Sequence, residues 1–61
     1  MTKKSEKARI LVADDEPHIR RILQFLLESA GFEVETVADG DVAWKAVTSF
    51  RPDLVLLFMM I

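Results

Sequence analysis

The chain contains no cysteine and only one histidine among its 61 residues. Without cysteine there are no disulfides and no thiolate metal sites, and the redox compartment cannot be read from the sequence. The single histidine, His18, argues against a structural zinc site. A chain this short buries only about 60% of the surface that its unfolded form exposes, so its own core gives marginal stability. A partner chain is the stabilising addition that remains.

Strong charge of either sign and long apolar runs are also lacking. The net charge is −2, and the basic residues are dispersed except at the lysine-rich start and at Arg20–Arg21, which argues against nucleic-acid binding. No apolar run approaches the ~20 residues that cross a bilayer, and no signal peptide is evident. We therefore expect a cytoplasmic protein with no membrane or nucleic-acid partner, and a flexible basic tail over residues 1–7.

Three segments have the composition of β-strands. Residues 8–13 (ARILVA) form a short apolar, β-branched run typical of a buried strand. Residues 32–38 (FEVETVA) alternate, which indicates a strand with one wet face or a sheet edge. Residues 54–61 are apolar on both alternating faces, so this strand should have helices above and below and strands on both sides.

Two helices are expected between these strands. In the first, which starts near Pro17 and stops at Gly31, apolar residues recur at helical spacing: Ile19, Ile22, Leu23, Leu26, Leu27 and Ala30. The second starts at Asp39-Gly40, ends at Pro52 and carries a shorter stripe: Ala43, Ala46, Val47 and Phe50. Alternating strands and helices predict a parallel α/β sheet with right-handed crossovers.

An acidic cluster, Asp14-Asp15-Glu16, directly follows the first expected strand. Ligands of open α/β sheets bind at the carboxyl ends of the strands, and two adjacent carboxylates there can hold Mg²⁺. Acidic residues just before a helix also satisfy its free amide groups, a role open to Asp15 or Glu16. Metal binding and helix capping are both open on spacing alone.

The stretch ILVADDEPHIRRILQFLLESAGFEVETVADGDVAWKAV, followed by RPDLVLL, resembles the first half of the receiver domain of two-component response regulators. The resemblance implies a flavodoxin-like fold in which the first strand lies between the second and the third (order 2-1-3). It also implies Mg²⁺ held by Asp14 and Asp15, and a histidine kinase that phosphorylates an aspartate at the end of the third strand. Position 58 matches that aspartate, and the backbone carbonyl of Met60 would complete the metal shell.

The sequence departs from the family at that position, because Phe58 has no carboxylate to attack a phosphoryl group or to bind Mg²⁺. The sequence also stops at Ile61, before the family's later Thr/Ser and Lys. We therefore expect residues 8–61 to be a truncated or engineered half receiver domain that is not an enzyme. Its metal site would be vestigial, with Mg²⁺ binding weak and no cofactor required.

A third strand without an outer neighbour would expose a long, uncharged apolar edge, which is a template for pairing with another chain. We predict a homodimer through this strand, antiparallel about a twofold axis, in one sheet ordered 2-1-3-3′-1′-2′. An aspartate near the middle of that interface would be a costly unpaired charge. The residues expected in the interface are Trp44, Leu54, Leu56, Phe58, Met59, Met60 and Ile61.

A signalling function is the alternative. The chain would then be a Mg²⁺-dependent phosphoacceptor, or a receiver that switches by binding a partner without being phosphorylated. His18 is expected to be exposed, Arg20–Arg21 to lie on a solvated helix face, and Trp44 to be core or interface.

Overall fold

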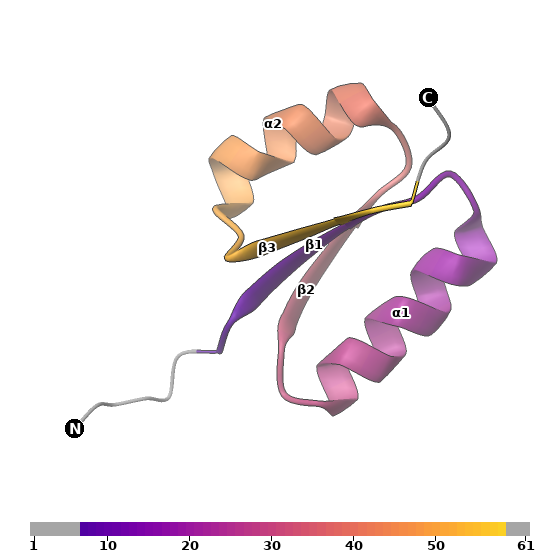
Figure 1. The fold of residues 1–61 in the computed structure, drawn as a ribbon, viewed down its shortest axis with the longest axis vertical. Helices are drawn as coiled ribbons and strands as arrows, with labels where there is room; N and C mark the ends of the chain where they lie inside the picture. The colour runs from indigo at the N-terminus through magenta and orange to yellow at the C-terminus, as the bar shows by residue number, and fades with distance from the viewer. Residues whose placement is uncertain (1–6, 59–61) are drawn as a thin grey trace.

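The computed structural model describes residues 7–58, which form three strands and two helices (Figure 1). In chain order these are β1 (Arg9–Ala13), α1 (Pro17–Ser29), β2 (Glu33–Val37), α2 (Gly40–Phe50) and β3 (Leu54–Leu57). The element order is the predicted one. The third strand was predicted to run to residue 61, but β3 ends at Leu57, and residues 59–61 lie outside the described residues. Residues 1–6 do too, so the flexible tail stays a prediction.

The three strands form one parallel sheet in the order β2-β1-β3. The whole of β1 pairs with β2, from Arg9 opposite Glu33 to Ala13 opposite Val37. On its other side β1 pairs with β3, from Ile10 opposite Leu54 to Ala13 opposite Leu57. This confirms the predicted flavodoxin-like α/β fold with order 2-1-3, and it makes β1 the central strand.

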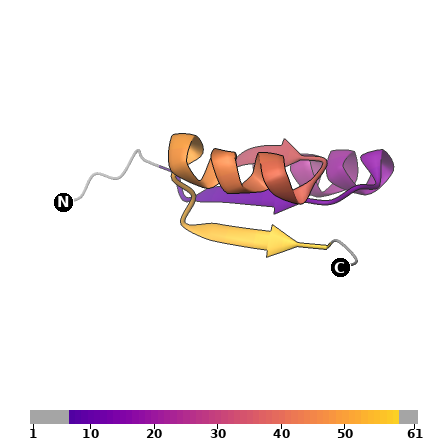
Figure 2. The same ribbon diagram turned by 90° about the horizontal axis from the view of Figure 1, so that it is seen from above.

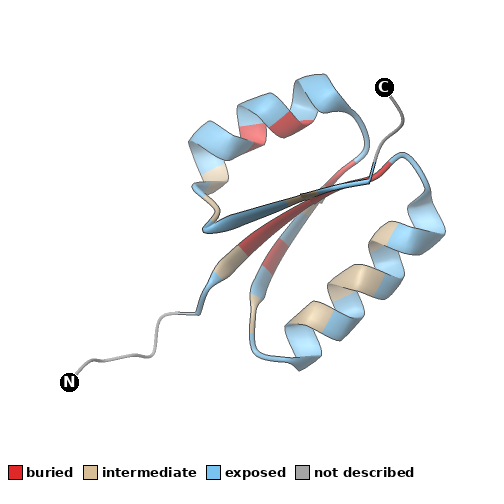
Figure 3. Cartoon of the chain, in the orientation of Figure 1, coloured by how far each residue is buried: buried red, intermediate tan, exposed pale blue. Residues whose placement is uncertain are grey.

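The core has two layers, one on each face of β1 (Figure 3). Ile10 and Val12 pack with Val34 beneath α1, which contributes Leu23 and Leu27. Side chains of successive strand residues point to opposite faces, and the other two β1 residues accordingly pack against α2, in a cluster of Leu11, Ala13, Val37, Ala43 and Ala46. These four β1 side chains are at most 4% exposed, which confirms the predicted buried strand.

The two sheet edges differ in character. β2 carries the exposed acids Glu33 and Glu35, which confirms the predicted wet edge. β3 lies along β1 on the other side (Figure 2), and within the described residues no Cα atom of either helix comes within 8 Å of a Cα atom of β3. Its side chains Leu54, Val55 and Leu57 are 42–54% exposed. The prediction that this strand is covered on both faces and flanked on both sides is therefore not met by residues 7–58.

The helix ends follow the sequence signals, with one correction. Gly31 has φ +100°, the left-handed conformation expected after α1. The Asp39 side chain caps α2 by accepting the N–H of Val42 at 2.9 Å. At α1, however, Glu16 is the N-cap residue and its side chain makes no capping hydrogen bond. The expectation that Asp15 or Glu16 caps α1 is thus wrong for Glu16, and no capping bond joins Asp15 to α1 either.

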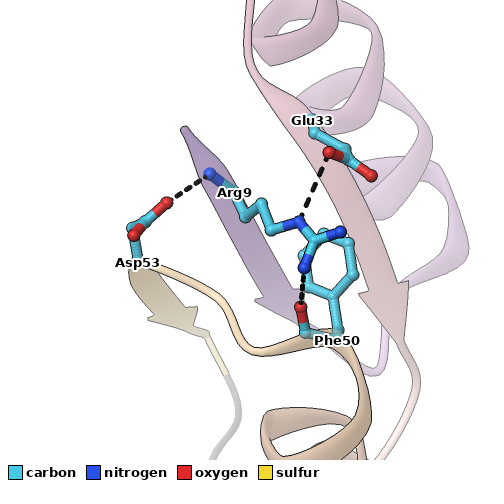
Figure 4. A network of polar contacts seen from close by, with 4 residues as sticks. All are labelled: Arg9, Glu33, Phe50 and Asp53. Carbon is cyan, nitrogen blue, oxygen red and sulfur yellow. Dashed lines mark hydrogen bonds and ion pairs between the residues drawn. The ribbon is translucent and has the colours of Figure 1, made fainter. Parts of the chain in front are cut away.

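Arg9 connects four elements at the amino end of the sheet (Figure 4). Its guanidinium donates to the Phe50 carbonyl at the end of α2 at 2.7 Å and lies 5.0 Å from the centroid of that ring. It also contacts Glu33 of β2 at 3.4 Å. The backbone N–H of Arg9 donates to the Asp53 carboxylate at 2.8 Å, and the N–H of Asp53 donates to the Arg9 carbonyl at 2.8 Å. Sequence reasoning treated Arg9 only as a strand residue.

We expect Arg9→Lys to lower the free energy of unfolding by about 1–2 kcal/mol, because lysine cannot both reach the Phe50 carbonyl and stack on the ring. Glu33→Gln should cost less than about 0.5 kcal/mol, because that ion pair is exposed and long. Urea unfolding at one fixed protein concentration measures both. Equal losses in the two variants would contradict the dominant role given to the carbonyl bond.

Candidate functional site

Asp14 is the first residue after β1, at the carboxyl edge of the sheet, and it is held from three sides. Its backbone N–H donates to the Val37 carbonyl at 3.1 Å, and its own carbonyl accepts from the Arg20 guanidinium at 2.7 Å. Its carboxylate oxygen Oδ1 accepts the N–H of Glu16 at 2.8 Å. Asp14 is 4% exposed, and among residues 7–58 it is the charged residue that is buried. The loop between β1 and α1 is therefore shaped by Asp14 itself.

Position 58 lies beside this loop although it is far away in the sequence. The N–H of Phe58 donates to the Ala13 carbonyl at 2.9 Å, and the preceding residue, Leu57, is paired with Ala13. Phe58 therefore follows β3 where Asp14 follows β1. The structure brings the acidic pair and position 58 to one edge, whereas Asp53 lies at the opposite end of β3, where it binds Arg9.

Of the groups that the resemblance implies for Mg²⁺, the structure describes Asp14 and Asp15, and Mg²⁺ binding stays a prediction. Asp15 is exposed and Asp14 already accepts a backbone N–H, while Phe58 offers no oxygen from its side chain. Among residues 7–58, no three His, Cys, Asp or Glu side chains gather closely enough to hold a metal ion. The carbonyl of Met60 lies outside the described residues. The side-chain donors that the structure describes here are the carboxylates of Asp14 and Asp15, and the Asp14 carboxylate already accepts the Glu16 N–H within the loop.

Arg20 corrects one expectation, and for Trp44, expected in the core or in an interface, the structure leaves the interface as a prediction. The pair Arg20–Arg21 was expected on a solvated face, and Arg21 is exposed, but Arg20 is half-buried and binds the Asp14 carbonyl. Nothing in the spacing of an amphipathic helix indicates that an arginine in its first turns reaches back to the preceding loop. Trp44 is 77% exposed, so within this chain it is not part of the core. His18 is exposed, as predicted.

Of the expected interface residues that the structure describes, Trp44 lies on α2, and Leu54, Leu56 and Phe58 lie in β3 or directly after it. Leu54, Leu56 and Phe58 alternate with Val55 and Leu57, so by register they share the α1 face of the sheet. Leu56 confirms this placement, because it packs on the core cluster beneath α1. Phe58 is 51% exposed. Met59, Met60 and Ile61 lie outside the described residues, so their part in an interface stays a prediction.

A parallel sheet with an acidic pair at the carboxyl end of its central strand is the architecture of a receiver domain. The family model of the response regulator receiver domain matches residues 10–61. The chain belongs to the response regulator receiver domain family.

Relatives match over this region alone. The chain is 44% identical over 55 residues to the DNA-binding response regulator MtrA of Mycolicibacterium smegmatis, covering 90% of this chain and 24% of the relative. It is 43% identical over 53 residues to the alkaline phosphatase synthesis transcriptional regulatory protein PhoP of Bacillus subtilis, covering 87% and 22%. It is 48% identical over 54 residues to the probable transcriptional regulator ycf27 of Cyanophora paradoxa, covering 88% and 23%.

The chain thus spans about a quarter of the length of the curated relatives it matches. Among residues 7–58, neither helix is long and apolar enough to span a membrane.

Holding the loop through the Glu16 N–H and binding a metal are two roles of Asp14 that make different predictions for stability. Asp14→Ala should lower the melting temperature by about 5 °C, corresponding to about 1 kcal/mol, because the Glu16 N–H loses its acceptor. Asp14→Asn keeps an acceptor oxygen and should cost less than half as much. Millimolar Mg²⁺ should leave the parent melting temperature unchanged. A Mg²⁺-dependent rise in the parent that Asp14→Asn abolishes would instead establish a working metal site.

Proposed function

We propose that this chain is a receiver-type interaction module that cannot be phosphorylated at the family's position and that associates with itself through β3. The observation that carries the proposal is the outer edge of β3, which is apolar, exposed and unpaired in the described residues and ends at Phe58. The module is not an enzyme and requires no cofactor.

The chemistry at position 58 supports the first half of the proposal. Phosphoryl transfer to a receiver needs a carboxylate nucleophile where Phe58 stands, and a phenyl ring offers none. Asp14 does not replace it, because its carboxylate is buried and accepts the Glu16 N–H. Asp53 does not replace it either, because it lies at the amino end of β3 and binds Arg9.

The difference between the two sheet edges supports the second half. Charged side chains on an edge strand oppose pairing with another strand, and Glu33 and Glu35 on β2 would repel the same acids of a second copy. No residue of β3 is charged, from Leu54 to Leu57. A second copy of this chain supplies a matching apolar edge at the same concentration as the first, and twofold pairing leaves no edge of β3 open.

Association should be visible as a concentration-dependent mass in sedimentation equilibrium, with dimer present at tens of micromolar. Phe58→Asp should weaken it at least tenfold, because it places a charge among apolar side chains of the interface. Phe58→Leu, which stays apolar, is the matched control and should weaken it less. A folded monomer at all concentrations would refute the self-association proposal, and a Phe58→Asp dimer as stable as the parent would remove Phe58 from the interface.

Phosphorelay signalling is the second candidate, and one observation favours it. Asp14, Asp15 and position 58 lie at one edge of a sheet whose family and named relatives are response regulators. A histidine kinase would be the partner, and a receiver that switches without phosphorylation would use partner binding in place of chemistry.

Incubation with acetyl phosphate and Mg²⁺, read by intact mass, separates the proposed module from a phosphoacceptor receiver. We expect no mass gain in the parent, because Phe58 cannot form an acyl phosphate. Phe58→Asp, which restores the carboxylate, is the positive comparison. A phosphoryl adduct on the parent chain would overturn the proposal of a non-phosphorylated module, and its position would be found by fragmentation of the modified peptide.

A further inference from the structure

The backbone of β3 determines how a second copy can pair with it. In a strand, the N–H and C=O groups of alternate residues point to opposite sides. The N–H of Phe58 points to β1, where it bonds the Ala13 carbonyl. Leu54 and Leu56 therefore also direct their backbone groups to β1, and Val55 and Leu57 direct theirs to the free edge. Two residues per chain thus have backbone groups available to a new strand.

An antiparallel partner satisfies all these groups in one register. When Val55 of one copy lies opposite Leu57 of the other, both residues of each pair exchange hydrogen bonds, and the twofold axis passes between the two Leu56 residues. When the twofold axis passes beside Val55, or beside Leu57, only that residue exchanges hydrogen bonds with the same residue of the other copy. The described edge therefore favours the register centred on Leu56.

A register centred further along, on Phe58, lacks support from β1. The last residue of β1 is Ala13, and beyond it the backbone groups of Asp14 are engaged elsewhere, its N–H by Val37 and its carbonyl by Arg20. Within the described residues, the last bond that joins this part of the chain to β1 is the one from the Phe58 N–H to the Ala13 carbonyl.

The resulting arrangement puts apolar side chains opposite each other. Leu54 of one copy lies across from Phe58 of the other, in a pair without direct hydrogen bonds, whose side chains come closest. Both pairs and the central Leu56 residues lie on the α1 face, so the rings of Phe58 contact leucine instead of each other.

One flank of α1 is directed toward this row of side chains. Arg20, Arg21 and Gln24 line a hollow together with Thr36 of β2, so by helical spacing Ile19, Ile22 and Leu26 are on the opposite flank of α1, the one on the β3 side. These three side chains are 39–55% exposed.

The two surfaces together approach the area that a stable dimer needs. At about 200 Å² for a large side chain, Leu54 and Phe58 offer roughly 200 Å² on the α1 face, Val55 and Leu57 roughly 200 Å² on the opposite face, and this flank of α1 roughly 300 Å². A standard interface buries about 800 Å² per partner.

We infer that a second copy of this chain pairs antiparallel with β3 in the register centred on Leu56, with Phe58 of each copy packed on Leu54 of the other. The inference rests on the proposed self-association and specifies its geometry. It moves Phe58 from the centre of the interface to two symmetric positions on either side of the axis.

Cysteine cross-linking tests the register directly, because the parent chain has no cysteine. Leu56→Cys should form a disulfide-linked dimer under mild oxidation, since twin residues at a non-hydrogen-bonded pair on the axis lie close enough to bridge. Val55→Cys, Leu57→Cys and Phe58→Cys place their thiols opposite other residues and should cross-link at least tenfold more slowly. Non-reducing electrophoresis measures all four rates.

Charge pairing provides a second test that leaves Leu56 intact. Leu54→Lys and Phe58→Glu should each weaken the homodimer, and mixing the two variants should give a heterodimer at least tenfold favoured over either homodimer. In that heterodimer the introduced lysine faces the introduced glutamate on one side of the axis, and the native Leu54–Phe58 pair remains on the other. Native mass spectrometry distinguishes the three species.

The outcomes separate this inference from the proposed function. Cross-linking at Leu56 with preferred heterodimers supports both. A parent dimer that cross-links fastest through Phe58→Cys, or that shows no heterodimer preference, overturns the register and leaves self-association standing. A parent that stays monomeric at all concentrations overturns both.

Discussion

The burial of β1 is the constraint on which the rest of the molecule depends. It is the one strand with a strand on each side and a helix on each face among the described residues, and its apolar side chains supply the centre of both core layers. Both helices are placed by packing against it, and both neighbouring strands take their register from it. Five residues thus organise a chain that is too small to bury much of its remaining apolar surface.

The same strand accounts for the location of the candidate site. Where β1 ends, Asp14 is turned away from β3 by its bond to Val37 and is fixed by Arg20. The carboxyl edge is therefore preorganised even though Phe58 supplies no charge to it. A receiver scaffold and the chemistry usually carried on it are separable, because the scaffold is built by packing and the chemistry depends on one side chain.

The sequence predicted the fold well because its signals were local and mutually consistent. The glycine after α1, the aspartate before α2 and the alternation in β2 each act within a few residues of the feature they determine. The contacts that escaped prediction are long-range or run against the local pattern. Arg9 reaches the end of α2 across more than forty positions, and Arg20 leaves the solvated face of its helix for a loop carbonyl. Trp44 was expected in the core or in an interface, and no residue among 7–58 buries it.

The clamp formed by Arg9 and Asp53 has a mechanical consequence for β3. Two hydrogen bonds between these residues fasten the beginning of the strand, whereas its far end is joined to β1 by the bond from Phe58 to Ala13. Because β3 is held by more hydrogen bonds at its beginning than at its far end, we expect it to open first next to Phe58. The edge of the sheet that is most exposed to a partner is therefore also the part expected to open first. A partner strand hydrogen-bonded to β3 would oppose that opening.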